Sequence, residues 1–250
     1  MVALHRSGHH AIVHWIEEQA GNVGCFLNDC SPRRNPYLTC AKDGYSSFKR
    51  VELSEQAAGR HTRKDFLLYN YESQELSAVA DSVFDANREK WLGRSKTRQD
   101  LLVLRDAFNF FASIRKVRDD RSGLFIDERL GNWVRLWKAY AREFKSDSAM
   151  LPEKVTVSFN AWVSDREYRK ALASKLGLEF TDAGRERVVA WGSSFDGKRF
   201  DGEASQMQVL KRWQGMAEDP LYRSLFRDRE LVDLSNEIFG FIPGTEELGR

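Results

Sequence analysis

Four short apolar segments, each followed by helical periodicity, most strongly constrain the fold of this chain. They lie at 2–5, 66–71, 101–104 and 155–159. The third is apolar without interruption, which is typical of a strand buried on both faces of a parallel sheet. Strands that alternate with helices favour an α/β fold, because each helix carries the chain back across the sheet. We therefore expect a central parallel sheet between two layers of helices.

Helices are expected at 9–20, at 77–91, from about 107 and at 128–144. The last has an apolar face, with side chains at helical spacing that should pack on the core: Leu130, Trp133, Val134, Trp137 and Tyr140. The stretch 25–64 holds scattered glycine, proline and polar residues and predicts loops with little regular structure. After residue 159 we expect helices apart from a loop at about 192–205.

Length and charge limit the class of protein. A chain of 250 residues suits one α/β domain over 1–250. A formal net charge of +2 is too small to indicate nucleic acid as the main partner. No apolar stretch is long enough to span a membrane, and the N-terminus lacks the pattern of a signal peptide, so we expect a cytoplasmic protein. The three cysteines Cys25, Cys30 and Cys40 lack a histidine pattern for zinc and are expected to be reduced thiols.

The loop at 5–10 follows the first expected strand and reads His-Arg-Ser-Gly-His-His. A strand, a tight loop and a helix start form a geometry that binds phosphate-like anions, because the first N–H groups of a helix have no intrahelical partner. Arg6, His9 and His10 would add side-chain donors. The loop lacks the GxxxxGK[ST] spacing of a nucleotide-binding P-loop, so an ordinary turn at Gly8 is an equal alternative.

A second candidate segment follows the strand 101–104. Arg105 and Asp106 come directly after it, and ligands of open α/β sheets bind beyond the carboxyl ends of the strands. Ser113 comes eight residues after Arg105, about two helical turns further on. We expect Arg105 and Ser113 to bind one phosphate together. The alternative is an ion pair between Arg105 and Asp106, with Ser113 an ordinary helical residue.

These two segments resemble the motifs of the sulfotransferase family, whose sulfuryl donor is 3′-phosphoadenosine 5′-phosphosulfate (PAPS). The family has a strand followed by [KR]-S-G-T-T-W, and this chain reads Arg6-Ser7-Gly8-His9-His10-Ala11. The family also has a strand ending in Arg with Ser eight residues later, as Arg105 and Ser113 are here. The resemblance implies that the first motif holds the 5′-phosphosulfate and the second the 3′-phosphate. It also implies the P-loop NTPase-like sulfotransferase fold, a three-layer α/β/α arrangement.

The C-terminal part shows a weaker resemblance to segments that contact the adenine and the 3′-phosphate. These residues are Ser193, Ser194, Phe195, Lys198, Lys211 and Arg212. The resemblance implies that the ring of Phe195 stacks on the adenine. The sequence departs from the family where His9-His10 replaces Thr-Thr, where Ala11 replaces a stacking Trp, and where Phe159-Asn160-Ala161 replaces Tyr-Glu-Asp. The second stacking residue is therefore unassigned.

The resemblance implies transfer of a sulfuryl group from PAPS to a hydroxyl or amine of a small-molecule, lipid or saccharide acceptor. By analogy with phosphoryl transfer, catalysis should consist mainly of positioning and charge stabilisation. Arg6 would meet the leaving phosphate, and the amides after Gly8 would surround it. We expect no metal requirement, because side-chain cations can neutralise the leaving group.

An acceptor hydroxyl needs a general base. Glu72 stands where the family commonly has a histidine, and a carboxylate needs a pKa raised by partial burial to act near neutral pH. His9, His10 and His14 are alternatives, and an ordinary surface carboxylate is the other interpretation of Glu72.

Two other classes of function stay open. One is a P-loop nucleotide-dependent kinase, for which Asp106 is the candidate magnesium ligand. The other is a non-catalytic module that binds an anion or nucleotide.

Overall fold

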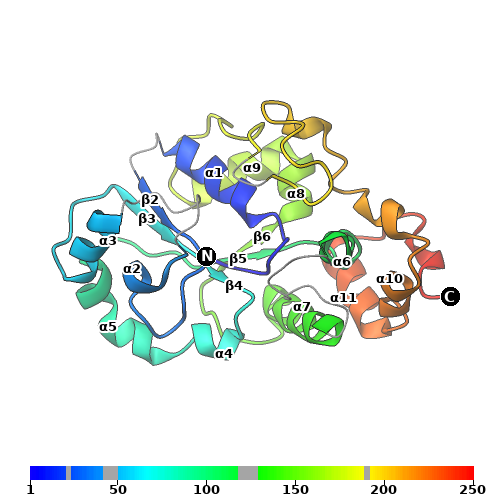
Figure 1. The fold of residues 1–250 in the computed structure, drawn as a ribbon, viewed down its shortest axis with the longest axis horizontal. Helices are drawn as coiled ribbons and strands as arrows, with labels where there is room; N and C mark the ends of the chain where they lie inside the picture. The colour runs from blue at the N-terminus through cyan, green and yellow to red at the C-terminus, as the bar shows by residue number, and fades with distance from the viewer. Residues whose placement is uncertain (21–23, 42–49, 118–128, 189–191) are drawn as a thin grey trace.

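The central sheet has four parallel strands in the computed structural model, which describes residues 1–20, 24–41, 50–117, 129–188 and 192–250. Its order is β4-β1-β5-β6, with bounds Tyr71–Glu72, Val2–Ala3, Leu101–Leu104 and Val155–Ser158. Each neighbouring pair is parallel. The expected α/β class with a central parallel sheet is therefore confirmed, and Figure 1 shows helices on both sides of the sheet.

A two-stranded parallel sheet continues beyond the β4 edge. It pairs β2 (Gly24–Leu27) with β3 (Phe66–Tyr69). Asn70 connects β3 to β4: its N–H donates to the carbonyl of Leu27 at 3.2 Å, and its own carbonyl accepts from the N–H of Cys30 at 2.8 Å. The strand expected at 66–71 is therefore two short strands that belong to different sheets.

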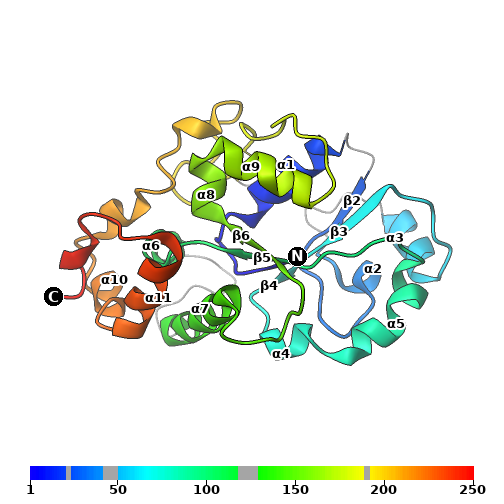
Figure 2. The ribbon, with the colours of Figure 1, turned by 180° about the vertical axis from the view of Figure 1, so that it is seen from behind.

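Helices cover both faces of the central sheet, and Figure 2 shows the same layers from behind. Successive side chains of a strand point to opposite faces. Ala3, Leu101 and Val103 pack in one apolar cluster with α1 (His9–Gln19), α8 (Phe159–Ser164) and α9 (Arg166–Lys175). Val2, Leu102 and Leu104 pack in the other cluster with α6 (Ala107–Lys116), α7 (Leu130–Lys145) and α11 (Arg229–Phe239). This layout is compatible with three layers, α/β/α.

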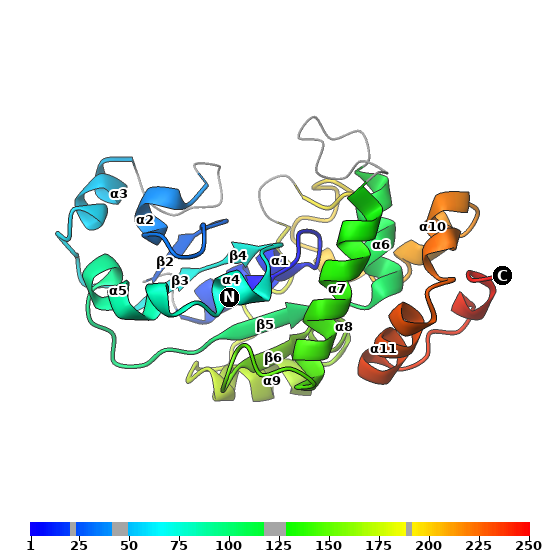
Figure 3. The same cartoon turned by 90° about the horizontal axis from the view of Figure 1, so that it is seen from below.

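Helix α7 matches the expected apolar helix and anchors one strand end. Residue 128, its expected start, lies outside the described residues, and the helix ends at Lys145. Figure 3 shows α7 beside α6. The buried Trp137 donates from Nε1 to the carbonyl of Arg105 at 3.0 Å, and the hydroxyl of Tyr140 donates to the carbonyl of Gln74 at 2.8 Å. The buried side chains of α7 thereby hold the backbone that follows β5 and the backbone at Gln74.

The prediction of loops over 25–64 is wrong. The segment contains most of β2 and the helices α2 (Pro36–Thr39) and α3 (Arg50–Ala57), while 42–49 lie outside the described residues. Asn35 caps α2, since its Oδ1 accepts from the N–H of Tyr37 at 3.0 Å and a proline follows it. Asn35 and Pro36, a polar residue and a proline of the kind that predicted loops, therefore begin a helix.

Other predicted boundaries shift where a side chain caps a helix. The helix expected at 77–91 is divided into α4 (Leu76–Val79) and α5 (Ser82–Leu92), because Asp81 accepts from the N–H of Val83 at 2.8 Å and starts a new helix. The strand expected at 155–159 ends at Ser158, whose Oγ accepts from the N–H of Ala161 at 3.2 Å and caps α8. The first strand, expected at 2–5, ends at Ala3.

The C-terminal region has a longer irregular stretch than expected. The described residues between α9 and the 3₁₀ helix η3 (Arg212–Met216) contain the 3₁₀ helix η2 (Ala204–Gln206) and no α-helix, so the loop extends beyond 192–205. Two helices, α10 (Pro220–Leu225) and α11, and the 3₁₀ helix η4 (Thr245–Glu247) follow.

Two expectations from composition can be compared with the described residues. Cys25, Cys30 and Cys40 are buried thiols that form no disulfide within the described residues. Within the described part of the chain, no helix has the length and apolar character needed to cross a membrane.

Candidate functional site

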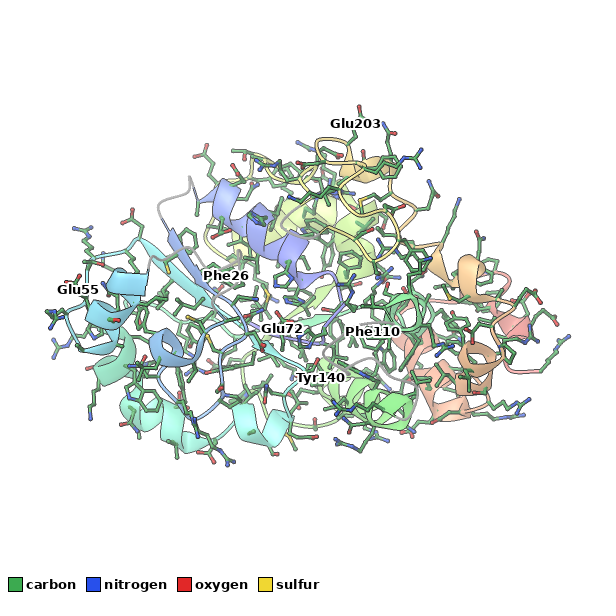
Figure 4. All side chains as sticks on the ribbon, in the orientation of Figure 1. Phe26, Glu55, Glu72, Phe110, Tyr140 and Glu203 are labelled. Carbon is green, nitrogen blue, oxygen red and sulfur yellow. The ribbon has the colours of Figure 1, made fainter. Side chains whose placement is uncertain are left out.

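The candidate site lies where the strands of the central sheet end. The chain leaves β1 into the loop 5–8, β4 ends at Glu72, β5 is followed by Arg105, and β6 is followed by Phe159. Because these strands are adjacent and parallel, their carboxyl ends meet at one edge of the sheet. Figure 4 places Glu72 near the middle of the molecule. Segments more than a hundred residues apart in sequence are thereby neighbours.

Gly8 allows the loop to pack directly against α8. It precedes α1 with φ 87°, a left-handed conformation that favours glycine. A Cβ atom at this position would lie 2.2 Å from the ring of Phe159. His9 and His10 form the first turn of α1, so their amides belong to the group without an intrahelical acceptor. Gly8 is therefore required by a close approach and is more than an ordinary turn residue.

The side chains of Arg105 and Ser113, which we expect to bind one phosphate together, form a hydrogen bond with each other. The Nη1 of Arg105 donates to Oγ of Ser113 at 3.0 Å and to the carbonyl of Arg6 at 3.4 Å, and its Nη2 donates to the carbonyl of Val209. Among the described residues Asp106 makes no ion pair with Arg105. Its carboxylate instead accepts from the N–H of Asn109 at 2.8 Å and from the amide of Asn160 at 2.9 Å.

Arg212 brings a second guanidinium to Ser113. Its Nη1 donates to Oγ of Ser113 at 3.3 Å. Burial and the charge of Arg212 lower the pKa of Arg105 to about 9. Burial lowers the pKa of Arg212 to about 10, although Asp196 at 3.6 Å opposes the shift. The Nε atoms of Arg105 and Arg212 are buried, and neither has a hydrogen-bond partner within the described part of the chain. An anion placed between these cations would supply both the missing acceptors and the missing negative charge.

A cavity of about 150 Å³ opens at this edge. Eight residues selected from the sequence line it: Arg6, Gly8, His9, His10, Ala11, Arg105, Ser193 and Arg212. Further lining residues were not selected, among them Phe159, Trp162, Arg185, Arg187 and Met207. Five arginines of the described residues therefore surround one small cavity, and this concentration of positive charge indicates an anionic ligand.

Glu72 and six other selected residues do not line the cavity. Ser7 and Ser113 are buried behind it, bonded to His9 and Arg105. Lys198 and Lys211 are exposed. The ring of Phe195 lies 5.1 Å from the guanidinium of Arg212 and 5.7 Å from the ammonium of Lys116, and Ser194 precedes it with an unpartnered hydroxyl. The role of Phe195 as an adenine platform therefore stays a prediction.

Glu72 is the centre of a histidine cluster. Its Oε2 lies 2.8 Å from Nε2 of His5, and its Oε1 lies 3.1 Å from Nε2 of His9 and 3.2 Å from Nε2 of His10. The amide of Asn70 donates to Oε1 at 3.1 Å. Glu72 is only 4% exposed, so the interpretation of it as a surface carboxylate is wrong. His14 pairs with Glu17 at 3.4 Å instead.

The environment of Glu72 acts against the raised pKa that the sequence argument required. Burial alone would raise this pKa, but the histidines outweigh burial and hold it well below its usual range. Burial and neighbouring His10 lower the pKa of His9 to about 4, so His9 is neutral at pH 7. Burial alone would lower the pKa of His5, but the hydrogen bond to Glu72 and its negative charge raise this pKa overall. Glu72 is therefore an ionised acceptor and a weak base.

Sequence reasoning missed the residues that complete this cluster. Asn70 and Asn28 support it, with Asn28 Oδ1 accepting from Asn70 at 3.1 Å and lying 2.8 Å from Nε2 of His10. The position of His5 directly after β1, next to β4 in the sheet, could have paired it with Glu72. Arg185 and Trp162 carry no such signal, because the irregular stretch after α9 and the helix α8 give no pattern that points to the cavity.

Comparisons with protein-family models, with curated proteins and with solved structures find no match for this chain. The resemblance to the sulfotransferases therefore rests on the motifs and on the geometry of the site.

Proposed function

We propose that this protein is a PAPS-dependent sulfotransferase. The observation that carries the proposal is the cavity shared by the segment Arg6–His10, by Arg105 and by Arg212, with both guanidinium groups donating to the hydroxyl of Ser113. PAPS carries anionic groups at both ends of its ribose, and the two motifs provide cations for each. A nucleotide with one phosphate group would leave one of these cationic sites unpaired.

The two anionic groups of the donor correspond to the two parts of the cavity. The 3′-phosphate would bind Arg105 and Arg212, whose guanidinium groups Ser113 holds together, and would fill their unpartnered Nε positions. The 5′-phosphosulfate would bind the first turn of α1 and Arg6. In the reaction the sulfur–oxygen bond to the phosphate breaks as the acceptor oxygen bonds to sulfur, and the leaving group is 3′,5′-adenosine bisphosphate. Arg6 would stabilise the charge that develops on the leaving phosphate oxygen.

The acceptor proton must pass to a base within reach of the cavity. Glu72 is enclosed by three imidazoles and does not line the cavity, so we assign it a positioning role. His10 lines the cavity with a side chain that is 23% exposed, and it contacts both Glu72 and Asn28. His10 is therefore the histidine best placed to accept the proton.

A kinase fits the geometry less well. The carboxylate of Asp106 is bonded to Asn109 and Asn160 and caps α6, so binding magnesium would break these contacts. We expect PAPS turnover in the presence of a chelator. A strict magnesium requirement together with phosphate transfer from ATP would support the kinase instead. Nucleotide binding without turnover across a panel of hydroxyl and amine acceptors would support the non-catalytic module.

The most direct test is thermal stabilisation by 3′,5′-adenosine bisphosphate compared with adenosine 5′-monophosphate, which lacks the 3′-phosphate. At a hundredfold excess over Kd the bisphosphate should stabilise the protein by about 2.7 kcal/mol. Arg105→Ala should weaken the bisphosphate by about 10- to 100-fold, the range of a charged hydrogen bond, and change the monophosphate little. Arg142→Ala, on the exposed side of α7, is the matched control. Equal losses for both nucleotides would contradict the role given to Arg105.

A further inference from the structure

The cluster around Glu72 contains donors of a type and number that bind transition metals. One donor atom from each of His9, His10 and Glu72 lies within 4.8 Å of the other two, on a buried floor of the site. Two imidazoles and one carboxylate are a common ligand set for zinc and related divalent ions. Three protein ligands leave a fourth position for water or an anion.

The imidazole of His9 supplies an independent observation. Its side chain is almost fully buried, and its Nε2 has no hydrogen-bond partner among the residues that the structure describes. That atom nevertheless lies 3.1 Å from Oε1 of Glu72, so it is aimed at the carboxylate without the geometry of a hydrogen bond. The other ring nitrogen, Nδ1, lies 3.2 Å from Oγ of Ser7. When Nδ1 carries the proton and donates it to Ser7, Nε2 presents a lone pair to the centre of the cluster.

The distances suit a tetrahedral ion. Zinc binds histidine nitrogen and carboxylate oxygen at about 2.0–2.2 Å, which separates neighbouring ligand atoms by about 3.3–3.6 Å. Oε1 of Glu72 is 3.1 Å from Nε2 of His9 and 3.2 Å from Nε2 of His10. A displacement of a few tenths of an ångström would bring these two pairs of atoms to the separation of a zinc site, and the two imidazole nitrogens, within 4.8 Å of each other, must reach the same separation. We propose that His9 Nε2, His10 Nε2 and Glu72 Oε1 bind a divalent transition metal ion, with zinc the best match.

Neighbouring residues orient these ligands as the outer contacts of metal sites do. His5 holds the other carboxylate oxygen of Glu72 at 2.8 Å, and Ser7 holds the other ring nitrogen of His9. Binding requires His10 Nε2 to give up its contact of 2.8 Å with Asn28. The oxygen of Asn28 keeps a donor in that case, because Asn70 donates to it at 3.1 Å. No buried acceptor is left without a partner by this exchange.

A metal on Nε2 of His10 would leave the ring proton on Nδ1, so the metal-bound form could not use His10 as the proton acceptor proposed for sulfotransfer. The test of the metal site uses no nucleotide and is independent of that reaction. The full chain is freed of metal with a chelator and titrated with Zn²⁺ by calorimetry and with Co²⁺ by visible absorption. We expect one equivalent of either ion and the d–d bands of tetrahedral cobalt. The buried thiols of Cys25, Cys30 and Cys40 are the competing ligands, and they would add sulfur-to-cobalt charge-transfer bands in the near ultraviolet. Such bands, or no binding at all, would overturn the proposal.

Variants separate a metal site from a hydrogen-bonded cluster. His9→Ala and His10→Ala should each weaken zinc by at least about 100-fold, and Ser7→Ala should weaken it by about 10-fold. His14→Ala is the matched control, since it makes the same change on the same helix outside the cluster. Circular dichroism establishes that each variant is folded. His10 is the less buried ligand, so its variant keeps the test valid if His9→Ala unfolds. Unchanged zinc affinity in the folded His10→Ala variant would refute the site.

Discussion

A methyl group added at Gly8 would meet the ring of Phe159 at 2.2 Å, and φ there is 87°. We expect Gly8→Ala to cost about 1–2 kcal/mol for the left-handed backbone and about 1–3 kcal/mol more for the overlap. Gly59→Ala is the control, because Gly59 has φ 81° and nothing within 4 Å of the added methyl, so only the backbone cost remains. Urea denaturation measures both losses.

The overlap at Gly8 can be separated from the backbone cost with a second change. Phe159→Leu shortens the side chain that the new methyl meets, so the double variant Gly8→Ala/Phe159→Leu should be more stable than the sum of the two single losses predicts. Strictly additive losses would show that the ring is not the obstacle.

At the scale of single residues, some neighbours could be predicted from the sequence and others could not. The proximity of Arg105 and Ser113 could be predicted, because both belong to one strand–helix unit with a regular rise. The surroundings of Glu72 could not be predicted, since they depend on which strand lies next to β4. The strand order places β1 there, and with it the loop that carries His5, His9 and His10. Because of this strand order, Glu72 is a buried hydrogen-bond acceptor, whereas the sequence suggested a general base.

At the scale of elements, α11 packs on α7 through apolar side chains and through ion pairs at the rim. Leu231 is fully buried, and its neighbour Glu230 pairs with Lys138 and Arg142 while 45% exposed. We expect Leu231→Ala to cost about 2–5 kcal/mol of unfolding free energy. Glu230→Gln should cost less than about 1 kcal/mol, because exposed ion pairs are screened by solvent. Thermal denaturation compares the two, and equal losses would contradict this division.

The end of α7 is held by a buried carboxylate with a defined pH dependence. Glu143 accepts from Lys154 at 2.8 Å and from the N–H groups of Met150 and Leu151 at 3.1 and 3.0 Å. Burial alone would raise its pKa, but these contacts lower it overall. Its contribution to stability is therefore present above the unfolded pKa of about 4.3 and is lost as pH falls through the lower folded value.

We accordingly expect Glu143→Gln to cost about 1–3 kcal/mol at pH 7. The difference from the unsubstituted protein should shrink as pH falls below about 4, because protonated glutamic acid then resembles glutamine. Glu237→Gln, at an exposed ion pair with Lys145 near the same helix end, is the control. A loss that does not change with pH would show that the charge of Glu143 contributes nothing.

Elements could be predicted where one strong pattern spans them. The run Leu101–Leu104 and the apolar stripe of α7 are confirmed as β5 and a core helix. The segment 25–64 failed because β2 and α2 span four residues each, too short to show periodicity. The break between α4 and α5 depends on one cap, Asp81, within a pattern that otherwise continues. Capping chemistry decided these boundaries more often than apolar spacing did.

The whole molecule carries little net charge, yet its cations are unevenly distributed. The formal net charge is +2, while five arginines line one cavity. We therefore expect the arginines of the cavity, and not the net charge, to attract an anion. Salt screens this attraction beyond a distance of about 10 Å at 0.1 M. Inorganic pyrophosphate is the suitable probe, because it tests the cationic cavity without the adenosine. It should raise the melting temperature, and the increase should fall as KCl rises from about 0.05 M to about 0.5 M.

Two adjacent residues make this a matched comparison. Arg212 lines the cavity and has an unpartnered Nε, whereas Lys211 is exposed and lies outside the lining. Arg212→Gln and Lys211→Gln remove the same charge from the molecule. If net charge attracts the anion, both variants should lose the same share of the stabilisation by pyrophosphate. If the cavity binds it, Arg212→Gln should lose most of that stabilisation and Lys211→Gln should keep nearly all of it, because only Arg212 offers donors to the ligand.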